Sequence, residues 1–117
     1  MKLDINKIQN KLLKFSKDRD WEQYHTPKNL VMALSVEVAE LVEIFQWSSN
    51  GGLDEISNPQ KRKQIEKEIA DIFNYLLRLV DIFKIDLEEI SLSKIEENEK
   101  KYPVNKVKGK ALKYTDL

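Results

Sequence analysis

The chain has 117 residues, no cysteine, and 20 basic and 20 acidic residues whose charges cancel at neutral pH. A chain of this length is most simply one domain with its own core. The lack of cysteine excludes disulfides and thiol chemistry, and the charge balance argues against a dedicated nucleic-acid binder. No run approaches the roughly 18 apolar residues of a membrane span and no apolar signal core follows Met1, so we expect a cytoplasmic protein without a membrane partner.

The first predicted helix runs from Ile5 to about Lys17, with Asp4 as its N-cap. Its apolar residues recur at three or four positions: Ile5, Ile8, Leu12 and Phe15. Residues 18–25 are polar and aromatic and are expected to end this helix and connect it to the next. A threonine cap and a proline at the first helical position, Thr26-Pro27, predict a second helix to about Trp47.

The second predicted helix is apolar on nearly all sides, which is typical of a helix central to a core or to an oligomer interface. A breaker-rich loop follows over residues 48–58 and contains Gly51-Gly52. A third helix is expected from about Pro59 to Phe83. A fourth begins after Asp86, with Leu87, Ile90 and Ile95 facing inward, and ends before Pro103.

The pattern predicts an all-α fold, a four-helix bundle, because no segment alternates with the period of a strand. Residues 1–103 would form the helical domain, and residues 104–117 an extended or partly ordered basic tail. From Lys100 to Lys113 there are six lysines and no acid, so this end of the chain carries a positive field that could meet phosphates.

Two acidic pairs lie inside the most apolar helices, Glu37 with Glu40 and Glu68 with Asp71. Residues three apart share a helix face. If the two faces oppose each other, four carboxylates converge, and each pair of charges about 4 Å apart repels by roughly 4 kcal/mol at an effective dielectric near 20. Protonation, solvation or a divalent cation must relieve that repulsion. Oxygen ligands favour Mg²⁺ or Mn²⁺, and Mg²⁺ usually shares its shell with phosphates.

Other polar and aromatic residues allow two interpretations. Trp21 and Trp47 could pack in the core or stack on a base. His25 directly precedes the threonine cap and suits a local hydrogen bond, and Tyr75, one turn beyond Asp71, suits an ordinary buried tyrosine. A stripe of residues on the fourth helix could be a solvated face or a phosphate-binding face: Lys94, Asn98 and Lys101.

Glu37-x-x-Glu40 and, after 27 intervening residues, Glu68-x-x-Asp71 resemble the signature of the MazG-like all-α nucleoside triphosphate pyrophosphohydrolases. Further segments resemble the dCTP pyrophosphatase branch, so that the likeness extends over about residues 8–116: Arg19 to His25, Pro27 to Leu30, Glu43 to Trp47, Tyr75, Lys94-x-x-x-Asn98-x-x-Lys101-Tyr102-Pro103, and Lys113 to Thr115.

The resemblance implies an enzyme that cleaves a nucleoside triphosphate, first dCTP or a modified dCTP, to the monophosphate and pyrophosphate in nucleotide-pool house-cleaning. It implies that Glu37, Glu40, Glu68 and Asp71 hold Mg²⁺ and carry the catalysis, with Mn²⁺ as a substitute. The base and sugar would meet Trp21, His25, Trp47 and Tyr75, and the phosphates Lys94, Asn98, Lys101 and Tyr102. The resemblance also implies a homotetramer, a dimer of dimers whose sites draw on neighbouring subunits.

One position departs from the family pattern, because Leu12 stands where animal members carry a histidine in the first helix. A missing polar partner implies a broader substrate range. The alternatives are a related pyrophosphohydrolase that prefers dUTP or a purine triphosphate, and a non-catalytic helical module for nucleotide sensing or oligomerisation.

Overall fold

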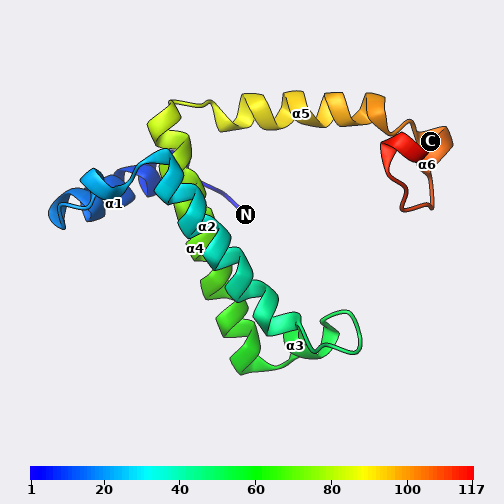
Figure 1. The fold of residues 1–117 in the computed structure, drawn as a ribbon, viewed down its shortest axis with the longest axis horizontal. Coiled ribbons are helices and arrows are strands. Elements are labelled where there is room, and N and C mark those ends of the chain that lie inside the picture. The colour runs from blue at the N-terminus through cyan, green and yellow to red at the C-terminus, as the bar shows by residue number, and fades with distance from the viewer. The chain divides into compact units, whose positions relative to one another are not determined.

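The protein, described by a computed structural model over residues 1–117, is helical throughout and has no strand, as predicted (Figure 1). The helices are α1 (Ile5–Asp18), α2 (Pro27–Phe45), α3 (Leu53–Ser57), α4 (Pro59–Phe83), α5 (Leu87–Lys101) and α6 (Val104–Val107), with 3₁₀ turns at Glu22–Tyr24 and Tyr114–Asp116. None of these helices combines the length and the apolar composition needed to cross a bilayer.

The N-caps that the sequence predicts are formed. Asp4 accepts from the backbone N–H of Lys7 at 3.0 Å, and Thr26 accepts from that of Asn29 at 3.2 Å. Asp86 accepts from Glu89 N–H at 3.1 Å, so α5 begins where its capping pattern places it. Side-chain caps satisfy N–H groups that have no partner within the helix, which is why these three starts could be located from residue type alone.

The region between α2 and α4 differs from its prediction. Helix α2 ends at Phe45 rather than near Trp47, and the expected loop contains the short helix α3. The turn before α3 is held by Ser48, whose Oγ accepts from Gly52 N–H at 2.7 Å and donates to the buried Glu55 carboxylate at 3.1 Å. Gly51 and Gly52 both have positive φ, so the pair reverses the chain and α3 can start.

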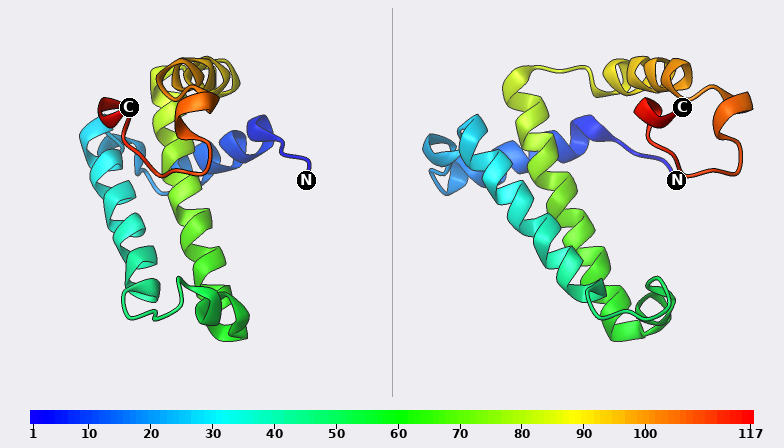
Figure 2. Two further views of the ribbon diagram at one scale, coloured as in Figure 1. Left: turned by 90° about the vertical axis from the view of Figure 1, so that its right-hand side faces the viewer. Right: turned by 45° about the vertical axis from the view of Figure 1, so that its right-hand side comes forward.

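The chain forms two compact units, Met1–Lys84 and Ile85–Leu117. In the first unit α2 and α4 pack against each other, and α1 and α3 pack on α4. Both views of Figure 2 show α2 and α4 as neighbours along their lengths. The core is small, and its fully buried apolar residues are Leu30 and Leu77. The predicted division at residue 103 stays a prediction.

The second unit contains α5, α6 and the C-terminal residues. The tail is partly ordered, because the ring of Tyr114 packs edge-on against Tyr102 with centroids 6.2 Å apart, and Lys101 Nζ lies 5.0 Å from the Tyr114 ring centroid. No residue of α5 is buried. The prediction that Ile90 and Ile95 face inward is therefore wrong within a single chain, where both are about half exposed.

Candidate functional site

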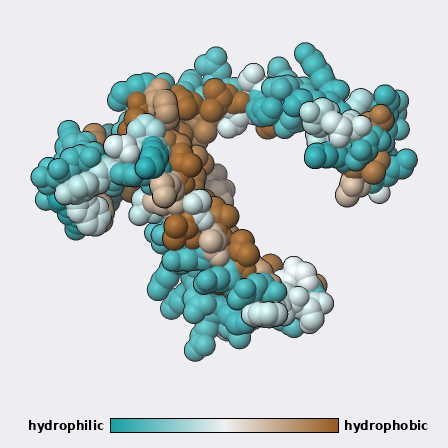
Figure 3. Space-filling model, viewed as in Figure 1, coloured by the Kyte–Doolittle hydropathy of each residue, from teal (hydrophilic) through white to brown (hydrophobic).

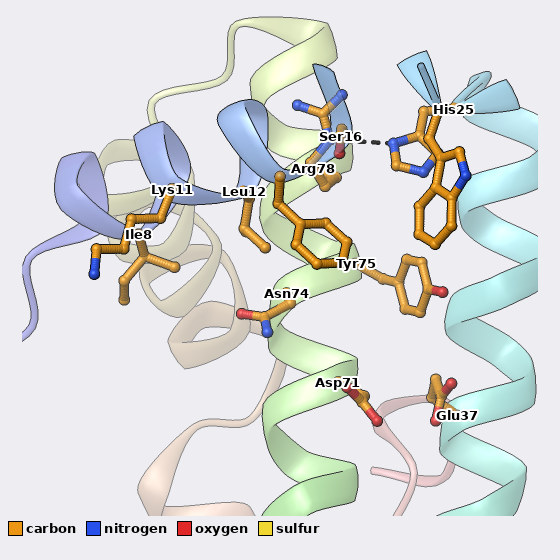
Figure 4. Close-up of a pocket in the computed structure, with 12 residues that line it drawn as sticks. Ile8, Lys11, Leu12, Ser16, His25, Glu37, Asp71, Asn74, Tyr75 and Arg78 are labelled. Carbon is orange, nitrogen blue, oxygen red and sulfur yellow. Dashed lines mark hydrogen bonds between the residues drawn. The ribbon is translucent and has the colours of Figure 1, made fainter. Parts of the chain in front are cut away.

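Three carboxylates meet between α2 and α4. Glu37 and Glu40 on α2 and Glu68 on α4 each place one oxygen so that all three lie within 4.8 Å of one another. The convergence follows from the packing of α2 on α4, because each helix presents its i, i+3 pair to the other. Asp71 is outside this trio, but Figure 4 shows it facing Glu37 across the same gap.

The electrostatics of the trio are those of crowded anions. The pKa of Glu37 is raised to about 7, and the largest cause is its contact with the Glu68 carboxylate. Burial comes next, and contact with Glu40 and the charges of Glu40 and Asp71 add to the effect. Carboxylates only accept hydrogen bonds when both are ionised. Glu37 Oε2 and Glu68 Oε2 are accordingly buried without a hydrogen-bond partner, so a proton or a cation would stabilise this arrangement.

A divalent cation fits these residues. Two buried oxygens lack partners, a third carboxylate lies within reach, and no nitrogen or sulfur ligand is present in the cluster. Such a donor set suits Mg²⁺ or Mn²⁺ and disfavours zinc. Glu37, Glu40 and Glu68 are therefore the residues that could hold the ion, with Asp71 beside them.

A pocket of about 670 Å³ lies between α1, α2 and α4 on one side of the carboxylates (Figure 4). Its lining is aromatic and polar, and includes Phe15, Trp21, His25, Tyr75 and Arg78, with Glu37 and Asp71 at the acidic end. Trp21 packs edge-on against Phe15 with centroids 5.7 Å apart. A pocket with flat aromatic walls and a few polar groups can hold a planar heterocycle.

Three of the predicted base-pocket residues are thus brought together: Trp21, His25 and Tyr75. Burial and the charges of Glu37 and Asp71 raise the pKa of Tyr75, so its hydroxyl stays protonated beside the carboxylates. Leu12 also lines the pocket. Trp47 does not, because it follows the last turn of α2 and is 88% exposed. It neither packs in the core nor reaches this pocket from its own chain.

A second pocket of about 550 Å³ borders the other side of the acidic cluster. It is lined by Glu40, Glu43, Ile44, Lys61, Gln64 and Glu68. Because Glu40 and Glu68 line it while Glu37 lines the first pocket, the carboxylate trio touches both. An extended ligand with a cation near its centre could use the two together.

The predicted phosphate-side residues lie in the second unit. Lys94 and Lys101 share Glu97 as an ion-pair partner, at 3.2 and 3.5 Å, and all three are on exposed α5 with Asn98. These contacts lower the pKa of Glu97, and the contact with Lys94 contributes most. Tyr102 caps the end of α5. The stripe is therefore formed and accessible within its own unit.

Arg78 is a polar residue of the first pocket that the sequence did not point to. Its side chain is buried, pairs with Asp81 at 3.2 Å, and donates from Nε to His25 Nδ1 at 3.4 Å. Burial and the charge of Arg78 lower the pKa of His25. An arginine within an apolar helical pattern is expected at the edge of the buried face. Its partner His25 is 53 positions away, so no local sequence pattern predicts the contact.

Comparison with known proteins places the chain among related sequences. The model of the MazG-like family matches residues 32–117. The chain is 43% identical over 108 residues to dCTP pyrophosphatase 1 of Bos taurus and 41% identical over 104 residues to that of Rattus norvegicus, covering 88% of this chain in each case. It spans 62% and 61% of the lengths of these two relatives.

A solved structure is similar over nearly its whole length. The crystal structure of a pyrophosphatase from Archaeoglobus fulgidus DSM 4304 superposes with a TM-score of 0.79 at 41% identity, covering 88% of this chain and 95% of that one.

Proposed function

This chain belongs to the MazG-like family, and on that premise we propose that it is a nucleoside triphosphate pyrophosphohydrolase, with dCTP or a modified dCTP as its first substrate. The products would be the nucleoside monophosphate and pyrophosphate, and the role nucleotide-pool house-cleaning. The relatives named dCTP pyrophosphatase 1 support the choice of base. We propose that it acts in the cytoplasm.

The observation that carries the proposal is the carboxylate trio beside a pocket that can hold a base. Glu37, Glu40, Glu68 and Asp71 would hold Mg²⁺, or Mn²⁺ in its place, and are the catalytic set. When bound, the cation would supply positive charge to the phosphoryl oxygens as the bond to the leaving pyrophosphate breaks. Two of the four, Glu37 and Glu68, already place unpartnered oxygens there.

The remaining residues have binding roles. Trp21, His25 and Tyr75 would line the base and sugar site, and Trp47 would join it in the assembled protein. Lys94, Asn98, Lys101 and Tyr102 would neutralise and orient the phosphates, because an amide, a phenol and two ammonium groups all donate to phosphate oxygens. The second pocket, with Lys61 at its edge, is where we place the far end of the polyphosphate.

We propose that the active form is a homotetramer, a dimer of dimers. Helix α2 leaves large apolar side chains exposed, and α5 buries none of its own. Packing against neighbouring copies would bury these surfaces, complete a four-helix bundle around residues 1–103, and leave residues 104–117 as a basic tail. Sites that need groups from more than one chain would account for Trp47 lying outside the pocket.

The test is release of pyrophosphate from a panel of nucleoside triphosphates with Mg²⁺, with Mn²⁺ and with EDTA. We expect dCTP to be cleaved, and EDTA to abolish the reaction. A preference for dUTP or a purine triphosphate would leave the proposed reaction unchanged and would correct only the proposed base. Binding of nucleotides without release of pyrophosphate from any of them would show a sensing module and overturn the proposal.

A further inference from the structure

Arg78 is a buried charge whose position needs an explanation. Only 6% of the residue is exposed, and burying a guanidinium is costly unless polar groups satisfy it. Asp81, one turn further along α4, balances the charge at 3.2 Å. The second contact reaches outside the helix, to His25 in the segment before α2 (Figure 4).

The contact with His25 decides where that ring carries its proton. Arginine has donors only and keeps its charge in proteins. The Nδ1 atom of His25, 3.4 Å from Arg78 Nε, must therefore accept, which requires a neutral ring with its proton on Nε2. Without this partner, either nitrogen could carry the proton.

His25 lines the first pocket together with Trp21 and Tyr75. With Nδ1 engaged by Arg78, the ring has one group left to offer a ligand, the Nε2–H donor. Leu12, on the α1 side of the pocket, offers no hydrogen bond in return. Asn74 and Tyr75 also bring polar groups to this pocket. The contribution of the histidine is a donor, and it is set by Arg78, a residue that the ligand need not touch.

We infer that Arg78 is a positioning residue that holds His25 as a hydrogen-bond donor through Nε2, available to an acceptor atom of a bound base, a carbonyl oxygen or an unprotonated ring nitrogen. This inference rests on the proposed function for the identity of the ligand as a nucleotide base. The tautomer itself depends only on the chain.

The tautomer can be measured without ambiguity because His25 is the only histidine. Long-range ¹H–¹⁵N correlation spectra of the intact, ¹⁵N-labelled protein at pH 8 should show a protonated Nε2 and an unprotonated Nδ1. In Arg78→Met this preference should weaken, so that the ring approaches the mixture of tautomers of a free imidazole. In Arg62→Met, a matched change at an exposed arginine of the same helix, it should persist. A wild-type ring protonated on Nδ1 would overturn the inference.

Binding of dCMP without metal, followed by quenching of tryptophan fluorescence, tests the consequence for the ligand. Arg78→Met should weaken binding roughly tenfold, the effect of one hydrogen bond, and Arg62→Met should not. Two amide variants of His25 test the donor directly. The side-chain N–H₂ of His25→Gln lies near the Nε2 position and that of His25→Asn does not, so His25→Gln should bind dCMP more tightly than His25→Asn. Equal binding by wild type, Arg78→Met and both amide variants would overturn the inference.

Because Arg78→Met leaves Asp81 without its buried partner, the double variant Arg78→Met with Asp81→Asn is compared in parallel after its helicity is checked by circular dichroism. Should neither variant fold, a wild-type ring protonated on Nδ1, or equal binding of dCMP by the two His25 variants, would still overturn the inference. Failure of the proposed function gives a different result: no triphosphate is cleaved, while the His25 tautomer remains as inferred.

Discussion

Glu40 is the most exposed member of the carboxylate trio, and it lies within 4.8 Å of both other ligand atoms. Replacing it with glutamine removes one charge and keeps the shape of the side chain. We expect Glu40→Gln to lower kcat at least about a hundredfold, because the lost carboxylate helps to hold the cation whose positive charge stabilises the transition state. Steady-state release of pyrophosphate measures the effect.

The matched control is Glu66→Gln, an exposed glutamate on α4 that pairs with Arg62 at 3.3 Å. It should keep wild-type turnover. Equal activity of Glu40→Gln and Glu66→Gln would remove Glu40 from the catalytic set.

Glu37 makes the stability of the metal-free protein depend on pH. Its pKa rises from 4.5 to about 7 on folding, so the folded chain holds this proton more tightly than the unfolded chain. The resulting stabilisation is complete below about pH 4.5 and is lost as the pH rises through about 7. In EDTA, we expect the melting temperature to fall between pH 5 and pH 8.

Two comparisons isolate this effect in thermal melts followed by circular dichroism. Glu37→Gln, which has no proton to lose, should show a flatter pH profile. Added Mg²⁺ should raise the melting temperature more at pH 8 than at pH 5, because protons and cation compete for the same oxygens. A wild-type profile that does not change with pH would contradict the assignment.

At the level of elements, the site depends on how the α2–α4 pair is connected. The chain reverses at Gly52, where φ is +90° and an added Cβ would lie 2.9 Å from the Phe45 ring. Gly51 also has positive φ, but nothing lies within 4 Å of its Cβ position. The two glycines therefore separate backbone strain from a steric clash.

We expect Gly52→Ala to lower the free energy of unfolding by about 2–4 kcal/mol, combining left-handed strain with displacement of Phe45. Gly51→Ala should cost about 1–2 kcal/mol, the strain alone. Urea titration followed by circular dichroism measures both values. A larger loss in Gly51→Ala than in Gly52→Ala would mean that the Phe45 contact does not constrain the turn.

At the scale of the whole molecule, apolar surface remains uncovered. Brown, hydrophobic atoms are visible over α2 and α4 in Figure 3. On α2 the large apolar residues that are exposed are Val31, Met32, Val36, Val38 and Val42. A surface of this kind in a chain with a small core favours association with further copies.

Val42, 58% exposed, tests the proposed tetramer. Val42→Glu should place a charge in the interface and shift the protein to smaller species, with at least a tenfold weaker association. Val42→Ala, which stays apolar, should remain tetrameric. Light scattering coupled to size-exclusion chromatography measures the mass, and a monomeric wild type at micromolar concentration would contradict the assembly.

The sequence alone was enough to predict the helical class, the starts of four helices and the two acidic pairs. These features depend on local rules, caps at helix starts and residues three or four apart on one face, that hold before the chain packs. Only the tertiary structure decided that Glu37, Glu40 and Glu68 meet while Asp71 lies beside them, that Trp47 stands outside the pocket, and that Arg78 contacts His25. Such distances are set by how α2 lies against α4 and by which side chains compete for the space between them, and neither is encoded in the spacing of residues along one helix.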